Sequence, residues 1–312
     1  MELFETIFSW LTSDKMLKLL IPVLVILLFE HLILRYCYNK PSSIERLLNP
    51  SQSAKTDMVA WSVYYIFFRF FDKAFSYLAL PGLVFIAARE AQKHYQVEGV
   101  LGDWMPENFV LAVIIWLVVY DFPHYVSHWL MHKIPVLWRY HRYHHAAEEM
   151  NIITGIRISL AERFLNSSLH LAIAIALLGL QNPGVPFFAL LTRRIIDLLQ
   201  HSNLPWGYGW FGYILASPRF HKIHHSRDVL DFDRNYGNIF SFWDFIFRTH
   251  NSRYESDRRS ADTCLLGLPD STEAKQYNSP FTGIFRHTFL FPVFRYLSKI
   301  KSGVQDRRSS MG

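Results

Sequence analysis

Long apolar runs alternate with polar loops along most of the chain. Residues 16–36, 58–88 and 108–131 are each apolar and long enough to cross a bilayer as a helix. No small-residue cleavage site follows the first run, which favours a retained spanning helix over a signal peptide. Two shorter apolar arms, 164–180 and 185–199, flank the turn sequence QNPG. The second arm carries charged residues, so we expect a re-entrant or bundle-buried helix there.

The loops between these runs differ in charge. Loop 37–57 holds lysine and arginine, whereas loop 89–107 is mainly acidic. Because lysine and arginine favour the cytoplasmic side, we expect the first loop inside and the second outside. The helix at 108–131 then returns to the cytoplasmic face, and the hairpin of shorter arms brings the chain back there. This topology predicts that residues 124–145 and 221–225 meet on one face.

Two polar residues, Glu30 and His31, interrupt the first apolar run. An interhelical hydrogen bond, or a polar helix end that reaches toward water, is the favoured interpretation. A polar group on a substrate path is the alternative.

Composition agrees with a chain partly in lipid. Hydrophobic residues make up 51% and aromatic residues 16%, and the net charge is +6. No basic stripe interleaved with aromatics lies on a polar domain, so we expect no nucleic-acid partner. Cys37 and Cys264 form neither a disulfide framework nor a cysteine metal site.

Histidines gather in three short motifs: HYVSH (124–128), HRYHH (141–145) and HKIHH (221–225). Residues spaced by three or four lie on one face of a helix, and neutral imidazole is a good metal ligand. Eight imidazoles exceed what one tetrahedral ion takes, and they suit two ions held close together. The candidate ligands are His124, His128, His141, His144, His145, His221, His224 and His225.

Three chemistries fit metal ions at the mouth of an apolar bundle. Iron ions can activate O2 against a C–H bond, zinc can hydrolyse a lipid headgroup, and a transporter can carry the metal. No HExxH motif supplies a hydrolytic base. Transport sites lie near the middle of the bilayer, whereas these motifs lie at helix ends. We therefore favour oxidative chemistry on an apolar substrate, such as an acyl chain or a sterol.

The three motifs resemble the histidine boxes of the fatty acid hydroxylase/sterol desaturase superfamily. The stretches SPRFHKIHHSRD (217–228) and NYGNIFSFWDFIF (235–247) are similar to further segments of that superfamily. The resemblance covers roughly residues 110–250, and the short gap between the first two boxes is like the hydroxylase branch. It implies a helical membrane enzyme with a non-haem di-iron centre, O2 as co-substrate and an external electron donor.

The resemblance also implies roles for single residues. The eight box histidines would be iron ligands, and His201 resembles an additional ligand. Asp197 stands where some members have another histidine, and pairing with a neighbouring arginine is favoured over ligation. Asn235 either orients a ligand histidine or caps a turn. Arg248 replaces a glycine common in the family, which puts the local turn in question.

Other residues near the motifs are expected to be structural. Trp243 and Asp244 are expected to pack and to form hydrogen bonds, and Arg157 and Glu162 to pair near the site. Three histidines outside the boxes are expected to be ordinary: His132, His170 and His250.

Together these features predict an all-α fold. We expect an integral membrane bundle of about four to six apolar helices under a His-rich cytoplasmic helical cap that holds a di-metal centre. Residues 1–57 would form a transmembrane helix and cytoplasmic loop, and residues 58–280 the fatty acid hydroxylase/sterol desaturase-like catalytic domain. Residues 281–312 would form a basic amphipathic segment and tail.

The predicted function is hydroxylation or desaturation of a lipid by a multi-pass membrane enzyme with two iron ions. The electron donor would be a separate ferredoxin, cytochrome b5-type carrier or reductase, docked on the basic cap. A His-rich metal transporter and a zinc-dependent lipid hydrolase remain the alternatives.

Overall fold

The computed structural model describes residues 14–64, 90, 99–179, 182, 184–251 and 264–280. Within these residues the chain is helical, and its only strand-like pairings are two isolated bridges. The predicted all-α class is therefore confirmed for the described part. Most of the predicted run 58–88, and the whole predicted segment 281–312, lie outside the described residues.

The helices follow in the order α2 (Asp14–Ile33), α3 (Ser43–Leu48), α6 (Phe109–Lys133), α7 (Pro135–His145), α8 (Leu160–Leu178), α9 (Gly184–Gln200), α10 (Pro218–His224), α11 (Phe242–Ile246) and α14 (Ser271–Tyr277). A π-helical turn, η1 (Leu34–Tyr38), extends α2, and residues 52–64 are also helical. Short 3-10 turns are η2 (Gly102–Trp104), η3 (Thr154–Ile156), η4 (Gly209–Tyr213) and η5 (Val229–Asp231). The expected helices at 16–36, 108–131, 164–180 and 185–199 are thus present as α2, α6, α8 and α9.

The expected plain loop at 37–57 is wrong. It contains α3 and the start of the helix at 52–64. Ser42 accepts a hydrogen bond from the Glu45 backbone N–H, and the Glu45 carboxylate accepts one from the Ser42 N–H. This capping box satisfies two free N–H groups at the start of α3, which lets a short helix form in a polar stretch.

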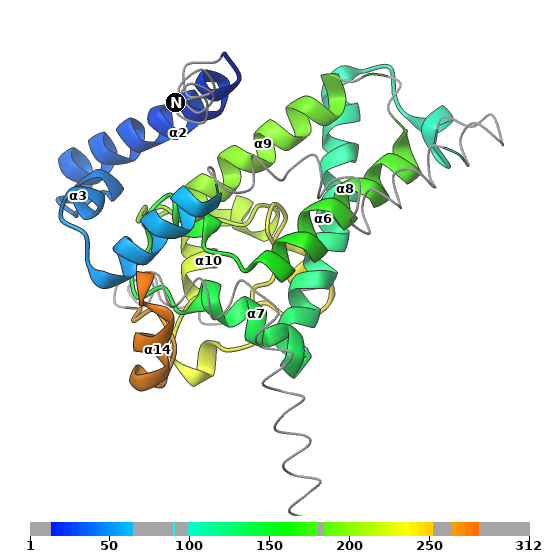
Figure 1. Ribbon diagram of the computed structural model, residues 1–312. Coiled ribbons are helices and arrows are strands. Elements are labelled where there is room, and N and C mark those ends of the chain that lie inside the picture. Colours follow the sequence, from blue (N-terminus) through cyan, green and yellow to red (C-terminus); the bar gives the residue numbers. More distant parts are fainter. Residues whose placement is uncertain are drawn as a thin grey trace, which may run out of the picture.

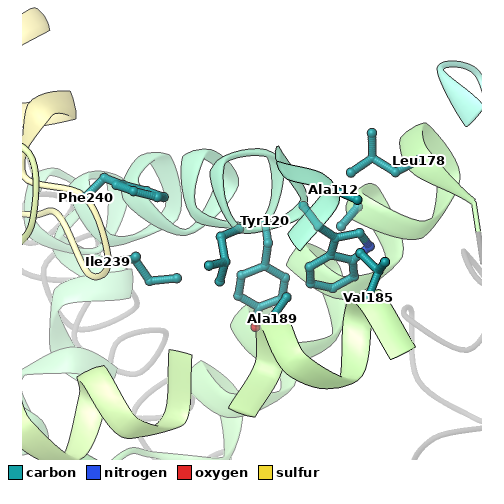
Figure 2. Close-up of a cluster of buried hydrophobic side chains, with 10 residues drawn as sticks. Ala112, Tyr120, Leu178, Val185, Ala189, Ile239 and Phe240 are labelled. Carbon is teal, nitrogen blue, oxygen red and sulfur yellow. The ribbon is translucent and has the colours of Figure 1, made fainter. Parts of the chain in front are cut away.

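The core lies where α6 crosses α8 and α9 (Figure 1). Trp116 and Tyr120 of α6 stack on each other and pack against Ala174 of α8 and Ala189 of α9. Ile239 and Phe240, far along the chain, close the same cluster (Figure 2). The cluster therefore fixes α6 relative to the segment that follows α10.

Within the described residues, two helices are long and apolar enough to cross a membrane: α2 with its extension (Ile21–Tyr38) and α6. Each leaves large apolar side chains uncovered, such as Leu24 at 59% exposure and Val110 at 65%. A continuous uncovered apolar face on a long helix is typical of contact with lipid. The shorter α9 packs against α2, α6 and α10.

Glu30 is a buried hydrogen-bond acceptor rather than part of a path. Its carboxylate accepts hydrogen bonds from the N–H and hydroxyl of Ser43 and from the N–H of Asn203, each at 2.9 Å. These bonds join α2 to the start of α3 and to the loop after α9. The favoured interpretation, a hydrogen bond between helices, agrees with this geometry.

Proline sets the turn between α6 and α7. A residue before proline is disfavoured in helical conformation, whereas proline itself is well suited to the first position of a helix. Accordingly α6 ends at Lys133, Ile134 is extended, and α7 begins at Pro135. The two helices contact each other, so the last turn of α6 faces the histidines of α7.

Arg157 lies at the centre of a fully buried polar network. It pairs with Asp57 at 3.2 Å, and it donates to the Tyr143 carbonyl at 2.9 Å and to Asn278 Oδ1 at 2.7 Å. The network joins the helix at 52–64, α7 and the end of α14. The expected pair of Arg157 with Glu162 is therefore wrong, because Glu162 contacts a histidine instead.

Replacing Arg157 with Met should strongly destabilise the protein. The change leaves Asp57 as a buried charge without its cation, which typically costs about 3–5 kcal/mol. The control is Lys133→Met, which removes an exposed pair with Asp233 and should cost at most about 1 kcal/mol. Unfolding in detergent measures both variants, and equal stability of the two would contradict this role of Arg157.

Candidate metal centre

Nine histidines converge in the middle of the fold, in two adjacent groups. Within each group the ligand nitrogens all lie within 4.8 Å of one another. The first group is His128, His132, His141, His145 and His224, and the second is His144, His201, His221 and His225. The groups touch, because the rings of His145 and His225 stack at 4.4 Å between centroids.

The two HxxHH motifs divide between the groups in a reciprocal way. His141 and His145, four residues apart on α7, belong to the first group, while His144 between them belongs to the second. In the other motif His221 and His225 belong to the second group and His224 to the first. Each motif thus gives a pair to one group and a single imidazole to the other, which explains why the spacing occurs twice.

Hydrogen bonds on the outer side of the rings fix the tautomers of four histidines. Backbone carbonyls accept from His128 Nδ1 (Tyr236 O), His201 Nδ1 (Asp197 O) and His224 Nδ1 (Arg234 O), each at 2.8 Å. Glu162 accepts from His141 Nδ1 at 2.7 Å. Because these acceptors carry no proton, the proton sits on Nδ1 and leaves an unprotonated Nε2 on the inner side.

The inner nitrogens of two histidine pairs then lie close together. His128 Nε2 lies 3.0 Å from His141 Nε2, and His201 Nε2 lies 3.0 Å from His221 Nε2. In the first of these pairs both tautomers are fixed by the outer bonds, so two lone pairs are opposed. A cation between them turns this repulsion into two ligand bonds.

Burial keeps five of the imidazoles in the neutral form, which is the form that binds metals. Desolvation lowers the pKa far below its usual value of 6.5 for His144, His145, His221, His224 and His225. Several of their buried nitrogens have no hydrogen-bond partner in the described part of the chain: His144 Nδ1, His221 Nδ1, His224 Nε2 and both nitrogens of His225. Buried polar atoms are normally satisfied, so these residues fit metal ions as their partners.

On α6, the two histidines that join the first group are His128 and His132, whereas the sequence motif predicted His124 and His128. His132, expected to be ordinary, is a member of the first group, and that expectation is wrong. His124, expected to be a ligand, lies outside both groups, and its ring packs against His170 at 5.1 Å between centroids. His124, His128 and His132 are each four residues apart, so the helical period alone offers two equivalent pairs.

The other predicted site residues lie around the groups. Asp197 pairs with Arg194 at 2.9 Å, and its carboxylate is 3.5 Å from His201 Nδ1. Asn235 has a left-handed backbone with φ +61° and bonds to the Phe220 carbonyl and the Asn251 N–H. It therefore shapes the turn beside Arg234, whose carbonyl holds His224.

Two buried carboxylates hold the segment after the third motif. Asp244 accepts from the N–H groups of Tyr236 and Gly237, and Asp121 accepts from those of Ile239 and Phe240. The Tyr236 carbonyl in turn accepts from His128. The expectation that Asp244 forms hydrogen bonds is confirmed, whereas Asp121 was not singled out from the sequence.

Arg248 has φ +56°, in the left-handed region where glycine is least strained. The glycine common at this position therefore has a physical reason, and the turn keeps its conformation with arginine in place.

Comparison with known proteins identifies the region that holds this site. Residues 113–249 match the family described as fatty acid hydroxylase. Over these residues the chain is similar to fatty acid hydroxylases. The resemblance of the histidine motifs to the fatty acid hydroxylase/sterol desaturase superfamily is thereby confirmed, and the matched residues include all nine histidines of the two groups.

Two relatives illustrate the similarity. The chain is 31% identical over 180 residues to ornithine lipid hydroxylase OlsE of Rhizobium tropici, covering 57% of this chain and 53% of that protein. It is 27% identical over 135 residues to alkylglycerol monooxygenase of Homo sapiens, covering 43% of this chain and 29% of that protein. The chain thus spans about half the length of the first and less than a third of the second. No solved structure matches.

A third relative carries the name of a different activity. The very-long-chain aldehyde decarbonylase GL1-5 of Oryza sativa subsp. indica is 25% identical over 172 residues, covering 51% of this chain and 27% of that protein. The proteins similar to this chain are thus named for more than one reaction.

Replacing Gly155 with Ala should weaken the second group selectively. A Cβ at this position would lie 2.8 Å from His201 Nδ1 and 3.2 Å from Asp197 Oδ1, so the His201 ring must move. Disturbing the hydrogen bonds that orient a metal-ligating histidine typically lowers metal affinity about 10–100-fold. Metal content measured after dialysis against a chelator should fall, with the loss confined to one ion.

The control is Gly207→Ala, where the nearest atoms belong to the flexible end of Arg219. Its metal content should match the unaltered chain. Full metal retention in the Gly155→Ala protein would contradict the tight contact with His201.

Proposed function

We propose that this chain is a membrane-bound di-iron oxygenase that hydroxylates or desaturates a C–H bond of a lipid with O2 and external electrons. One observation carries the proposal: two adjacent groups of buried imidazoles whose inner nitrogens face each other at 3.0 Å. The similarity to fatty acid hydroxylases supports the oxidative chemistry. The names of the relatives, a lipid hydroxylase and an alkylglycerol monooxygenase, support a lipid substrate.

The proposed ligands are the nine histidines of the two groups, with one iron ion in each group. His132 takes the place first given to His124, and His201 completes the second group. Imidazole suits iron as well as zinc, copper and nickel, so the choice of iron rests on the similarity to fatty acid hydroxylases. Bound there, the iron ions would supply O2 activation and hydrogen abstraction from a nearby C–H bond.

The protein supplies orientation and exclusion of water. Backbone carbonyls and Glu162 hold the imidazoles in a single tautomer, so the ligand nitrogens need not reorganise when a metal binds. Burial of the rings limits access of water to the reacting centre. Asp121 and Asp244 hold the backbone of residues 236–240 by hydrogen bonds, and the Tyr236 carbonyl in that segment accepts from His128.

Reducing electrons would come from a separate protein of the ferredoxin, cytochrome b5 or reductase type. A cavity of about 360 Å³ reaches His132, His145 and His224 and is bordered by Trp138 and Arg142. Arg227, Arg234 and Arg248 are exposed on segments near the third motif. The cavity is also lined by Asp233, Asp270 and Glu273, so the attraction of an acidic donor would come from the three exposed arginines.

The proposed setting is a multi-pass membrane protein with its centre at the cytoplasmic face. The uncovered apolar faces of α2 and α6 support membrane insertion, and the basic loop at 37–57 supports the orientation. We keep the proposed division into residues 1–57, the catalytic domain 58–280 and the C-terminal segment 281–312. The activities for which the relatives are named do not support a metal transporter or a zinc hydrolase.

Exchanging single histidines distinguishes the two possible pairs on α6. His132→Ala should reduce bound metal and abolish activity, as should His144→Ala and His225→Ala, because each removes a proposed ligand. His124→Ala is the matched control on the same helix face, and it should retain the full metal content. A protein that loses metal with His124→Ala and keeps it with His132→Ala would contradict the assignment.

The activity itself is tested with the purified chain in lipid, a generic reductase system and a lipid extract. We expect lipid-dependent O2 uptake and, for hydroxylation, one atom of labelled O2 in the product. Zinc as the sole bound metal, with no O2 uptake and lipid hydrolysis without O2, would contradict the proposal.

A further inference from the structure

A cavity of about 280 Å³ opens directly beside the two histidine groups. Its lining includes both groups, since His128 and His141 of the first and His144, His201 and His221 of the second border it. The rest of the lining combines charged side chains with the apolar Ile156 and Ile158. A small molecule or molecular end in this cavity would therefore touch the proposed metal ligands.

The charged residues of the lining are not evenly paired. Arg194 forms an ion pair with Asp197 at 2.9 Å, and Glu162 is bonded to His141 at 2.7 Å. Arg193, which also lines the cavity, has no ion pair with a carboxylate in the described part of the chain. Its buried Nε has no hydrogen-bond partner there, and its guanidinium lies over the Tyr120 ring at 5.5 Å.

Two buried carboxylates, Asp121 and Asp197, attract Arg193 electrostatically, but neither forms an ion pair with it. Both oxygens of Asp121 accept backbone N–H bonds from Ile239 and Phe240, each at 3.0 Å. Asp197 is bound to Arg194, and Glu162 to His141. Arg193 is therefore left without a hydrogen-bonded carboxylate, and guanidinium forms strong, directional bonds with carboxylate and phosphate.

Two further polar groups make this part of the cavity unsuited to a bare hydrocarbon. His124 and His170 both line the cavity, and the Nδ1 atom of each is buried without a hydrogen-bond partner in the described residues. Burying such atoms against an alkyl chain would leave their hydrogen-bonding capacity unmet. Polar oxygens of a ligand would satisfy them.

The size of the cavity limits what it can hold. Liquid water takes about 30 Å³ per molecule, so the cavity holds a polar end group with a few carbons, not a whole acyl chain. A long tail would have to leave the cavity along its apolar side. The carbon nearest the histidine groups would then be close to the polar end of the lipid.

We infer that this cavity binds the oxyanion end of an acidic lipid, a carboxylate or a phosphate, with Arg193 as the positioning residue. Oxidation then takes place on a carbon near that end, rather than in the middle of an acyl chain. The statement about oxidation rests on the proposed oxygenase function, whereas the binding site for an acidic lipid does not. Arg193 acts on the reaction only through the position of the bound lipid.

The experiment is a binding titration of the full chain, as purified with its metal and without O2, so that no turnover occurs. The probes share one acyl chain: palmitate, 1-palmitoyl lysophosphatidate and the neutral 1-palmitoylglycerol. Inorganic phosphate is the probe without a chain. We expect at least one acidic lipid to bind about tenfold more tightly than the neutral lipid. The probe with this advantage shows whether the end group is a carboxylate or a phosphate.

Arg193→Gln should remove the advantage of the acidic lipid while leaving binding of the neutral lipid unchanged. Arg193→Lys should keep part of it, because it retains the charge but not the planar fork. The matched control is Arg35→Gln, an exposed arginine away from the cavity lining, which should behave like the unaltered chain. If Arg193→Gln fails to fold, the Lys variant alone still tests the role of the fork.

Any of three outcomes would overturn the inference. The first is that the unaltered chain binds acidic and neutral lipids equally, and the second is that a folded Arg193→Gln protein keeps the preference for the acidic lipid. The third is that inorganic phosphate binds as tightly as the lipid probes, which would indicate a site for a free anion. An oxygenase that is active but shows no acidic preference would overturn this inference alone, whereas acidic binding without O2 uptake would overturn only the oxygenase function.

Discussion

The opposition of unprotonated imidazole nitrogens is the interaction on which the rest of the structure depends. His128 and His141 each donate their only proton outward, to the Tyr236 carbonyl and to Glu162, and their inner nitrogens are 3.0 Å apart. A metal ion bound between them turns this repulsion into two ligand bonds, and the outward hydrogen bonds then become part of metal binding. The fold and the proposed metal centre are stabilised by the same bonds.

Much of the surrounding architecture serves to hold these rings in place. The turn at Pro135 sets α7 against the end of α6, which brings His141 and His145 to His128 and His132. Asp121 and Asp244 hold the backbone of residues 236–240, and Arg157 joins α7 to the helix at 52–64 and to α14. None of these groups is a proposed ligand. Each nevertheless fixes an element that carries ligands or their hydrogen-bond partners.

The sequence predicted the class of the fold and the convergence of the histidine motifs, because helical periodicity and apolar runs are local properties. It did not predict which pair on α6 joins the first group. His124, His128 and His132 share one helix face, and the choice depends on where the bend at Ile134 places α7. The partner of Glu162 was also missed, since Arg157 and His141 are both near it in sequence and the tertiary packing decides between them. Asp121 sits within an apolar run and accepts from residues more than a hundred positions away, so no local pattern marks it.

Metal analysis of the purified chain combined with X-ray absorption at the iron edge tests the central claim most directly. The predicted result is one iron ion for each of the two histidine groups, with nitrogen-rich ligation, no sulfur neighbour and a second iron nearby. A single ion per chain, sulfur ligation or a chain that stays fully folded with no bound metal would contradict it.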